Sequence, residues 1–253
     1  MTYLDRLRWL VGAVAACVLL GACSVVPRAE ALEEPSQPSG ENGAVDWLAP
    51  AEGPFSNYIA TASAESLAVY DAPLGTLSET LAADPGRPLV LALTERPRPE
   101  ARFAPVMLPG RPNGRTGWID LDDVDVTWTN YRIRIEVGAR TLTLYDRDET
   151  LFQSTIAVGT DANPTPLGTT YVAETLVNPD AGGLYGPYAL GLALWSETLT
   201  EYAGGDGQVG LHGTARPDLL GTAVSHGCVR VHNDVIRELA GRIPLGTPVD
   251  IVS

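Results

Sequence analysis

Glycine and proline occur so densely along this sequence that a fold built from short strands and turns is predicted. The 253 residues include 26 glycines and 20 prolines, and apolar residues make up 45% of the chain. Glycine and proline weaken or end regular elements, while an apolar fraction of this size can supply a hydrophobic core. The length suits two small domains or one medium domain. We therefore expect a mainly β protein rather than a helical bundle.

The charge of the chain argues against one class of partner. Acidic residues outnumber basic ones, and the formal net charge is -14 at pH 7. Because binding to nucleic acid depends on neutralising its phosphates, we expect no nucleic-acid partner. Soluble polymers, peptides and cell-wall material remain open as partners.

The first 23 residues have the pattern of a secretory signal peptide. Arg6 and Arg8 give it a positive start, and the apolar stretch at residues 9–20 is too short to span a membrane comfortably. Small residues stand directly before Cys23, which resembles the lipobox of bacterial lipoproteins, where cleavage leaves the cysteine as a lipidated N-terminus. An ordinary signal peptide that happens to contain Cys23 is the alternative. We expect an exported protein, anchored by lipid on Cys23 to the outer face of the cytoplasmic membrane.

Only one cysteine remains for the folded part of the chain. Cys17 lies in the apolar part of the signal and Cys23 would carry the lipid, so Cys228 has no partner for an internal disulfide. Oxidising compartments usually pair or eliminate cysteines. An unpaired Cys228 in an exported protein therefore requires an explanation.

After the signal, the chain divides into a tether and a β-rich unit. Residues 24–54 hold five prolines among Glu, Ser, Gly and Ala, and this composition predicts a flexible tether. Residues 55–127 contain short apolar runs broken by turn residues, at 66–70, 89–93, 106–108 and 117–119. Such runs predict a small β-barrel, and the Gly-Trp-Ile run near its end is similar to bacterial SH3-like domains. A β-rich spacer without a ligand is the alternative.

A second unit is predicted from residue 130 to residue 253. Residues 131–137 and 141–145 alternate polar and apolar side chains on either side of a turn that begins at Gly138, which is typical of a β-hairpin. Further strands are expected at residues 152–158 and 249–252.

One helix is expected, near the end of the chain. Asn233 is predicted to cap it and Gly241 to end it. Between them, apolar residues recur at helical spacing: Val235, Ile236, Leu239 and Ala240. The second unit is therefore predicted to be β structure with a short C-terminal helix.

All three histidines lie close to Cys228 in the sequence. His212, His226 and His232 fall within a 21-residue window that also contains the cysteine. A thiol becomes a strong nucleophile when a neighbouring imidazole or backbone dipoles favour its thiolate. An inert buried cysteine and a zinc site stay open as alternatives. The window lacks the Cys-x-x-Cys and His-x₃-His patterns of zinc sites, so we expect no metal.

The spacing within this window resembles a known family. His-Gly-Thr at 212–214 and Ala-Val-Ser-His-Gly-Cys-Val-Arg at 223–230 together resemble the signature of the YkuD-type L,D-transpeptidase domain. Thr-Pro-Leu-Gly-Thr at 165–169, Gly-Pro-Tyr-Ala-Leu at 186–190 and the turn at 244–248 resemble further family segments. The resemblance covers about residues 130–253 and implies a YkuD-like β-sandwich catalytic domain. Part of the family carries Asn at the position of Arg230, and another part carries Arg.

The resemblance implies a set of catalytic roles. Cys228 is the expected nucleophile and His212 the general base, with the Gly213 carbonyl orienting the imidazole in place of the carboxylate of a Ser-His-Asp triad. His226 is expected to support the loop, and its acting as the base is the alternative. The N–H groups of Gly227 and Cys228 are expected to form an oxyanion hole.

Other residues near this window are assigned to substrate binding or to structure. Ser225 and Arg230 are expected on the substrate side. Ser225 is expected mainly to hold the turn, and the guanidinium of Arg230 offers hydrogen-bond donors in a fixed arrangement to polar groups of the substrate. Tyr185 and Tyr188 are expected to pack against a peptide stem, with ordinary core packing as the alternative. His232 is expected to be structural.

The implied reaction cross-links peptidoglycan stem peptides, and so serves cell wall biogenesis and cell shape. Cys228 attacks the carbonyl of the third residue of a tetrapeptide stem, D-alanine leaves, and an amine of a second stem attacks the thioester to give a 3→3 link. The resemblance implies no cofactor and implies that carbapenems acylate Cys228. We expect a monomer. An L,D-carboxypeptidase that uses water as acceptor and a non-catalytic wall-binding lipoprotein are the alternatives.

Overall fold

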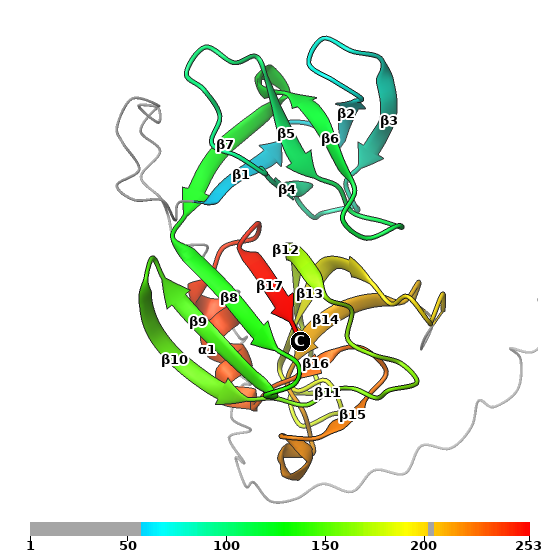
Figure 1. Cartoon of the computed structure of the whole chain (residues 1–253), viewed down its shortest axis with the longest axis vertical. Coiled ribbons are helices and arrows are strands. Elements are labelled where there is room, and N and C mark those ends of the chain that lie inside the picture. Colours follow the sequence, from blue (N-terminus) through cyan, green and yellow to red (C-terminus); the bar gives the residue numbers. More distant parts are fainter. Residues whose placement is uncertain (1–56, 202–204) are drawn as a thin grey trace, which may run out of the picture. The chain divides into compact units, whose positions relative to one another are not determined.

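The computed structural model describes residues 57–201 and 205–253. The predicted signal peptide, the tether and the lipidation site Cys23 lie outside these residues and stay predictions. The described chain is mainly β, as predicted, and has one α-helix near its end (Figure 1). Within the described residues, no helix has the length and apolar character needed to cross a membrane.

Residues 57–129 form two antiparallel sheets, of order β4-β1-β7 and β3-β2-β6-β5. The bounds are β1 Asn57–Ala62, β2 Ser66–Tyr70, β3 Leu77–Ala82, β4 Val90–Ala92, β5 Phe103–Met107, β6 Thr116–Asp120, the 3₁₀ turn Leu121–Asp123 and β7 Val124–Thr129. The four runs predicted as strands occur here as β2, β4, β5 and β6. Those strands are confirmed, while the SH3-like architecture and the domain boundaries stay predictions.

Alternation along these strands builds the core of this part. Leu67 and Val69 of β2 are 1% and 0% exposed, and Val106 of β5 is also fully buried. Successive side chains of a strand point to opposite faces, so each strand gives the core one apolar row. The same cluster contains Tyr171 and Ala193, which belong to later strands. The two β parts of the chain therefore share one hydrophobic cluster.

Residues 131–253 form an eight-stranded sheet of order β10-β9-β8-β17-β12-β13-β14-β16 and a two-stranded sheet, β11-β15. The bounds are β8 Tyr131–Glu136, β9 Thr141–Asp146, β10 Glu149–Thr155, β11 Val158–Gly159, β12 Gly168–Val177, β13 Tyr188–Trp195, β14 Gln208–His212, the 3₁₀ turn Pro217–Leu219, β15 Ala223–Ser225, β16 Val229–Arg230 and β17 Pro248–Val252. The strand predicted at 152–158 is divided, because β10 ends at Thr155 and β11 begins at Val158.

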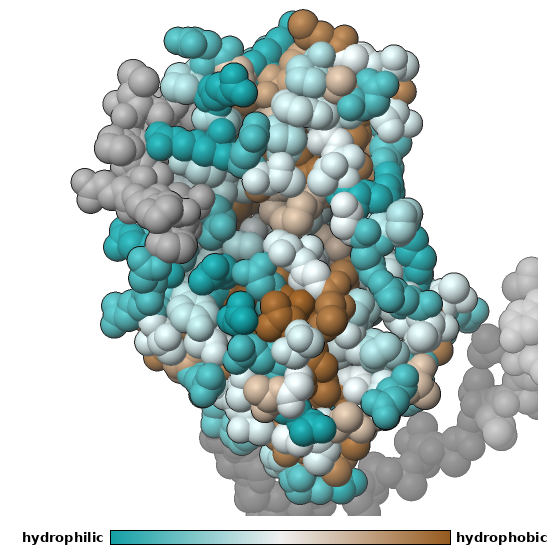
Figure 2. Space-filling model, viewed as in Figure 1, coloured by the Kyte–Doolittle hydropathy of each residue, from teal (hydrophilic) through white to brown (hydrophobic). Residues whose placement is uncertain are grey.

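The last strand joins the predicted hairpin to the rest of the sheet. β8 and β9 pair antiparallel, with Ile135 opposite Leu142, which confirms the hairpin. β17 pairs parallel with β8 and antiparallel with β12. The core of this part is a cluster of apolar side chains from the strands and from α1. On the face drawn in Figure 2, hydrophilic and intermediate residues are interrupted by a hydrophobic patch. The same sheet ends in the neighbouring strands β14 and β16, which position the residues described next.

The single helix, α1 Asn233–Arg242, differs at both ends from the prediction. The N-cap is His232, whose Nδ1 accepts the N–H of Asp234 at 3.3 Å, rather than Asn233. The helix runs past Gly241 to Arg242. Ile236 and Leu239 are buried against the core, and α1 packs against β13 and β14. The predicted apolar stripe thus fixes the helix beside the strands of the site.

Candidate active site

The pairing of β14 with β16 brings the two ends of the histidine–cysteine window together. The strands run parallel, with Leu211 opposite Val229 and His212 opposite Arg230. Cys228 immediately precedes β16. A small cavity of about 80 Å³ is lined by both Cys228 and His212. The structure therefore places the predicted nucleophile and the predicted base in one cavity.

His212 is held as a neutral imidazole with one nitrogen already bonded. Its side chain is 6% exposed, and Nδ1 lies 2.6 Å from the carbonyl oxygen of Gly213. Because a carbonyl can only accept, Nδ1 carries the proton and Nε2 keeps its lone pair. Burial lowers the pKa of His212 to about 4, the Gly213 bond raises it, and the charge of Arg230 lowers it. His212 is therefore a free base at neutral pH.

The Cys228 thiol is protonated at neutral pH. Burial raises its pKa, while a backbone hydrogen bond from Gly210 and the charge of Arg230 act in the opposite direction with smaller effect. With His212 also neutral, the resting pair is a thiol and an imidazole rather than a thiolate and an imidazolium. Attack by the sulfur therefore needs proton transfer to a base during the reaction.

Four hydrogen bonds fix the turn that presents Cys228. Ser225 Oγ donates to the Cys228 carbonyl at 2.6 Å and accepts from the Gly227 N–H at 3.1 Å. Thr165 Oγ1 donates to the Gly227 carbonyl and accepts from the Gly159 N–H, both at 2.9 Å. Gly227 has φ of 119°, a conformation that other residues rarely adopt. The turn is held from both sides, so the cysteine has a fixed position.

This geometry bears on two predicted roles. Ser225 lines the cavity, but it is 2% exposed, and its hydroxyl donates to Cys228 and accepts from Gly227 inside the turn, as expected for a residue that mainly holds the turn. Its hydroxyl proton is therefore not available for donation to a substrate. The Gly227 N–H donates to that hydroxyl and is not available to an oxyanion. Within the described chain the Cys228 N–H donates to no backbone group, and it remains the candidate donor.

The two tyrosines predicted to contact substrate lie in different surroundings. Tyr185 lines the cavity, and its ring centre lies 4.7 Å from that of His212 with an angle of 53° between the planes. Tyr188 begins β13 and packs against the hydrophobic core without lining the cavity. Core packing, the alternative reading, therefore holds for Tyr188, while Tyr185 covers part of the imidazole.

Arg230 and His226 complete the polar lining beside Cys228. The backbone of Arg230 exchanges two hydrogen bonds with Ala157, each of 2.9 Å. Its Nε is buried and has no hydrogen-bond partner among the described residues. His226 is exposed at the cavity. A fixed positive charge thus stands beside the reacting groups, where it can attract a carboxylate.

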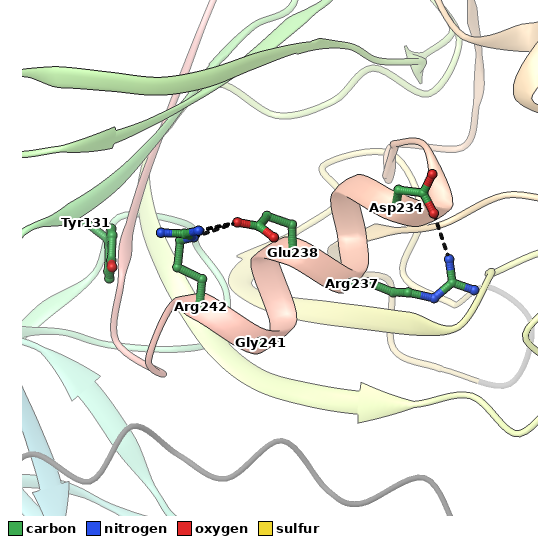
Figure 3. A pocket seen from close by; sticks show the side chains of 6 residues that line it. All are labelled: Tyr131, Asp234, Arg237, Glu238, Gly241 and Arg242. Carbon is green, nitrogen blue, oxygen red and sulfur yellow. Dashed lines mark hydrogen bonds and ion pairs between the residues drawn. The ribbon is translucent and has the colours of Figure 1, made fainter.

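A second hollow beside α1 carries no reactive group. Figure 3 shows its lining: Tyr131, Asp234, Arg237, Glu238, Gly241 and Arg242. Arg237 pairs with Asp234 at 3.0 Å and Arg242 Nε with Glu238 at 2.7 Å. Exposed pairs of this kind contribute little stability, and no thiol or imidazole faces the hollow.

Across the described ranges, no group of three or more His, Cys, Asp and Glu side chains is arranged for a metal.

Two residues near the site have roles that the sequence does not reveal. Thr165 lies in the run at 165–169, but nothing in the sequence shows that its hydroxyl bonds to the carbonyl of Gly227. Asn233 looks like a helix cap in the sequence, yet its Oδ1 accepts the Thr214 N–H at 2.8 Å. Both bonds join segments far apart in the chain, so only the fold reveals them.

Comparison with known proteins finds similar sequences for the part of the chain that contains this cavity. Residues 130–251 match the family model of the L,D-transpeptidase catalytic domain, YkuD. The YkuD proteins of Bacillus licheniformis and Bacillus subtilis are 40% and 39% identical to this chain over 121 residues, which are 48% of this chain and 65% of each relative. The solved structure of Bd1075 from Bdellovibrio bacteriovorus is similar at 27% identity with a TM-score of 0.40, over 49% of this chain and 48% of that one.

The matched segment contains both walls of the cavity that hold Cys228 and His212. The chain spans less than two thirds of the length of the two Bacillus relatives, at 65%. Residues 130–251 thus match the YkuD-type L,D-transpeptidase catalytic domain, and the cavity of Cys228 and His212 lies within the matched segment.

Proposed function

We propose that the protein is a cysteine-dependent acyltransferase that forms 3→3 cross-links between peptidoglycan stem peptides. The observation that carries this proposal is the cavity in which the Cys228 thiol lies with a buried, neutral His212. The Nδ1–H of that imidazole is bonded to Gly213, which leaves Nε2 to take a proton. This arrangement fits acyl transfer through a thiol that is activated only during attack.

The first step forms a thioester. His212 Nε2 takes the Cys228 proton as the sulfur attacks the carbonyl carbon of the third residue of a tetrapeptide stem. The tetrahedral oxyanion accepts a hydrogen bond from the Cys228 N–H. The bond to D-alanine then breaks as His212 returns the proton to the leaving amine. Free D-alanine and an acylated Cys228 result.

The second step regenerates the enzyme. The side-chain amine of a diamino acid on another stem attacks the thioester carbonyl, and His212 takes a proton from this amine. The carbon–sulfur bond breaks, the sulfur regains a proton, and a new amide joins the two stems. Every proton in both steps moves through His212.

Two cavity residues are suited to holding the stem. The guanidinium of Arg230 offers a permanent positive charge to a stem carboxylate, and the ring of Tyr185 offers an apolar face beside His212. Leu184, next to it, is 74% exposed and also lines the cavity. The cavity itself is small, at about 80 Å³, so we propose that only the reacting end of a stem enters it.

A second candidate is an L,D-carboxypeptidase, in which water replaces the acceptor amine. The first step is the same, and the exposure of His226 at the cavity gives water access to the thioester. The two candidates therefore differ only in the acceptor of the acyl group. Their products separate them.

Incubation of the full-length protein, kept in detergent, with tetrapeptide muropeptides tests the proposal. We expect mass spectrometry to find a dimer whose mass is that of two muropeptides less one alanine, and fragmentation to locate a 3→3 link. Cys228→Ala is expected to form neither this dimer nor any shortened stem. Tripeptide monomers without dimers would support the carboxypeptidase, and unchanged muropeptides would contradict both candidates.

A further inference from the structure

The Gly213–Thr214 peptide group is bonded at both of its ends. Its carbonyl oxygen lies 2.6 Å from His212 Nδ1, and its N–H donates to Asn233 Oδ1 at 2.8 Å. One rigid plane therefore connects an amide side chain on α1 to the imidazole on β14. The side chain that the sequence assigns to the helix cap is used here instead, because His232 caps α1.

The backbone around this peptide is packed too tightly to move alone. A Cβ on Gly213 would lie 2.9 Å from the Cα of Gly186 and would also meet Asn233 Oδ1. A Cβ on Gly186, which has φ of 63°, would meet the same carboxamide oxygen. The Asn233 carboxamide is thus packed closely against both glycines, and its bond to the Thr214 N–H fixes the orientation of the peptide beside it.

We infer that Asn233 is a positioning residue for His212, acting through the Gly213–Thr214 peptide. Accepting the N–H polarises the peptide and strengthens its carbonyl as the partner of Nδ1–H. The imidazole is then held in one tautomer and one orientation, with Nε2 toward the cavity. In a Ser-His-Asp triad the Asp carboxylate orients the histidine; here the Asn233 side chain and the Gly213–Thr214 peptide group share that role. It rests on the proposed function only in taking His212 as the base.

Asn233→Ala and Asn233→Asp test this inference. Asn233→Ala removes the oxygen that accepts the Thr214 N–H. Acylation of Cys228 at pH 7 is then expected to fall roughly 10- to 100-fold, because a misplaced imidazole can cost that much in rate. Asn233→Asp keeps an oxygen at the same place and is expected to retain most of the rate. His232→Ala is the matched control, since it removes the cap from the same helix without touching the peptide.

A double-substitution cycle separates positioning from general damage to the fold. If Asn233 acts through His212, then adding Asn233→Ala to His212→Ala is expected to cost almost nothing further. An equal loss in both backgrounds, or a full rate in Asn233→Ala, would overturn the inference. A wild-type protein that never acylates Cys228 would instead refute the proposed function.

The pKa of His212, measured without substrate, tests the role of Asn233 independently of the proposed function. Groups that face His212 are Arg230, Cys228 and Tyr185. These groups are the same in both variants. The negative charge of the carboxylate in Asn233→Asp favours the protonated imidazole, so an NMR titration is expected to show a raised pKa of His212, while His232→Ala leaves that pKa unchanged. An unchanged pKa of His212 in Asn233→Asp would show that the carboxamide does not communicate with the imidazole.

A separate set of contacts ties the first β part to the wall of the same cavity. Arg111 Nη2 donates to the Ser196 carbonyl at 3.2 Å and to the Leu199 carbonyl at 3.0 Å. Asn113 pairs with the backbone of Trp195, accepting its N–H and donating to its carbonyl, both at 2.8 Å. The loop at 109–115 therefore continues the hydrogen bonding at the end of β13 as a strand would.

The residues held in this way line the Cys228 cavity. Ser196, Leu199 and Gly207 are all cavity residues, and the Ser196 N–H donates to the Gly207 carbonyl at 2.8 Å. We propose that Arg111 and Asn113 are positioning residues that set this wall for the acyl donor. They lie outside the matched catalytic segment, so part of the site is built by the first β part of the chain.

Arg111→Ala is expected to raise the KM for the acyl donor roughly tenfold, because the bonds of a charged donor to two carbonyls are lost. Alkylation of Cys228 by a small reagent should keep its rate, since the thiol and His212 are untouched. Arg87→Ala is the control: Arg87 also crosses between the β parts, but it pairs with Glu174, which is not a cavity residue. An unchanged KM in Arg111→Ala, or an equal change in Arg87→Ala, would overturn the proposal.

Discussion

Replacing His212 with alanine is expected to lower the rate of Cys228 acylation at pH 7 on the order of 10²–10⁴-fold. The thiol has a pKa raised by burial, so it keeps its proton at neutral pH when no base is present. Below the pKa of the thiol, the thiolate fraction of the variant rises about tenfold for each unit of pH. Its rate should therefore recover in part at alkaline pH, which stopped-flow measurement of acylation would show.

The wild-type protein is expected to depend on pH in a different way. The pKa of His212 is lowered to about 4, so its basic form prevails at every pH above that value. Acylation should therefore keep its rate from about pH 7 to about pH 5 and fall only as the pH passes through the pKa of the buried imidazole. A rate that already falls with the usual pKa of histidine, about 6.5, would show that His212 is not the buried base described here.

His226 provides the comparison that assigns the base. His226→Ala can also lose activity, because His226 belongs to the turn that presents Cys228, but alkaline pH should not restore its rate. Circular dichroism must first show that both variants are folded. If raising the pH rescues His226→Ala and not His212→Ala, the base has been assigned to the wrong histidine.

Local patterns in the sequence predicted much of the fold. The alternation at 131–137 and 141–145 gave the β8–β9 hairpin, and apolar spacing gave α1. The positions of the strands in the sheet were not predictable in this way. The insertion of β17 between β8 and β12, for example, includes a parallel pairing with β8, whose residues lie more than a hundred positions earlier, and no local pattern records this.

The candidate site was likewise predicted in part, and its remaining contacts depend on the fold. The roles of Cys228 and His212 were predicted from the resemblance of the surrounding residues to a known family, and the structure places both side chains in one cavity. The N–H of Gly227 was assigned to the wrong role, because its bond to the Ser225 hydroxyl depends on the conformation of the turn. Asn233 was assigned to the helix cap because Asn is a common cap, and only the packing of α1 beside β14 reveals its bond to Thr214.

Substitution of Cys228 is expected to have the largest effect of all. Cys228→Ala removes the sulfur that forms the acyl bond, so no covalent intermediate can form and acyl transfer should be abolished. Cys228→Ser keeps the shape of the side chain, but its hydroxyl is a far weaker nucleophile at neutral pH. Both variants should stay folded, because the turn is held by the Cys228 carbonyl and by Ser225 and Thr165, not by the thiol.

Intact-protein mass spectrometry after incubation with a carbapenem tests the central claim most directly. The strained lactam is an acyl donor: the sulfur of Cys228 bonds to its carbonyl carbon, the ring C–N bond breaks, and the ring nitrogen takes the proton. We predict a mass increase of one whole carbapenem on the wild-type protein and none on Cys228→Ala or Cys228→Ser. An adduct that persists on Cys228→Ala, or a wild-type protein that gains no mass, would contradict the assignment of Cys228 as the nucleophile.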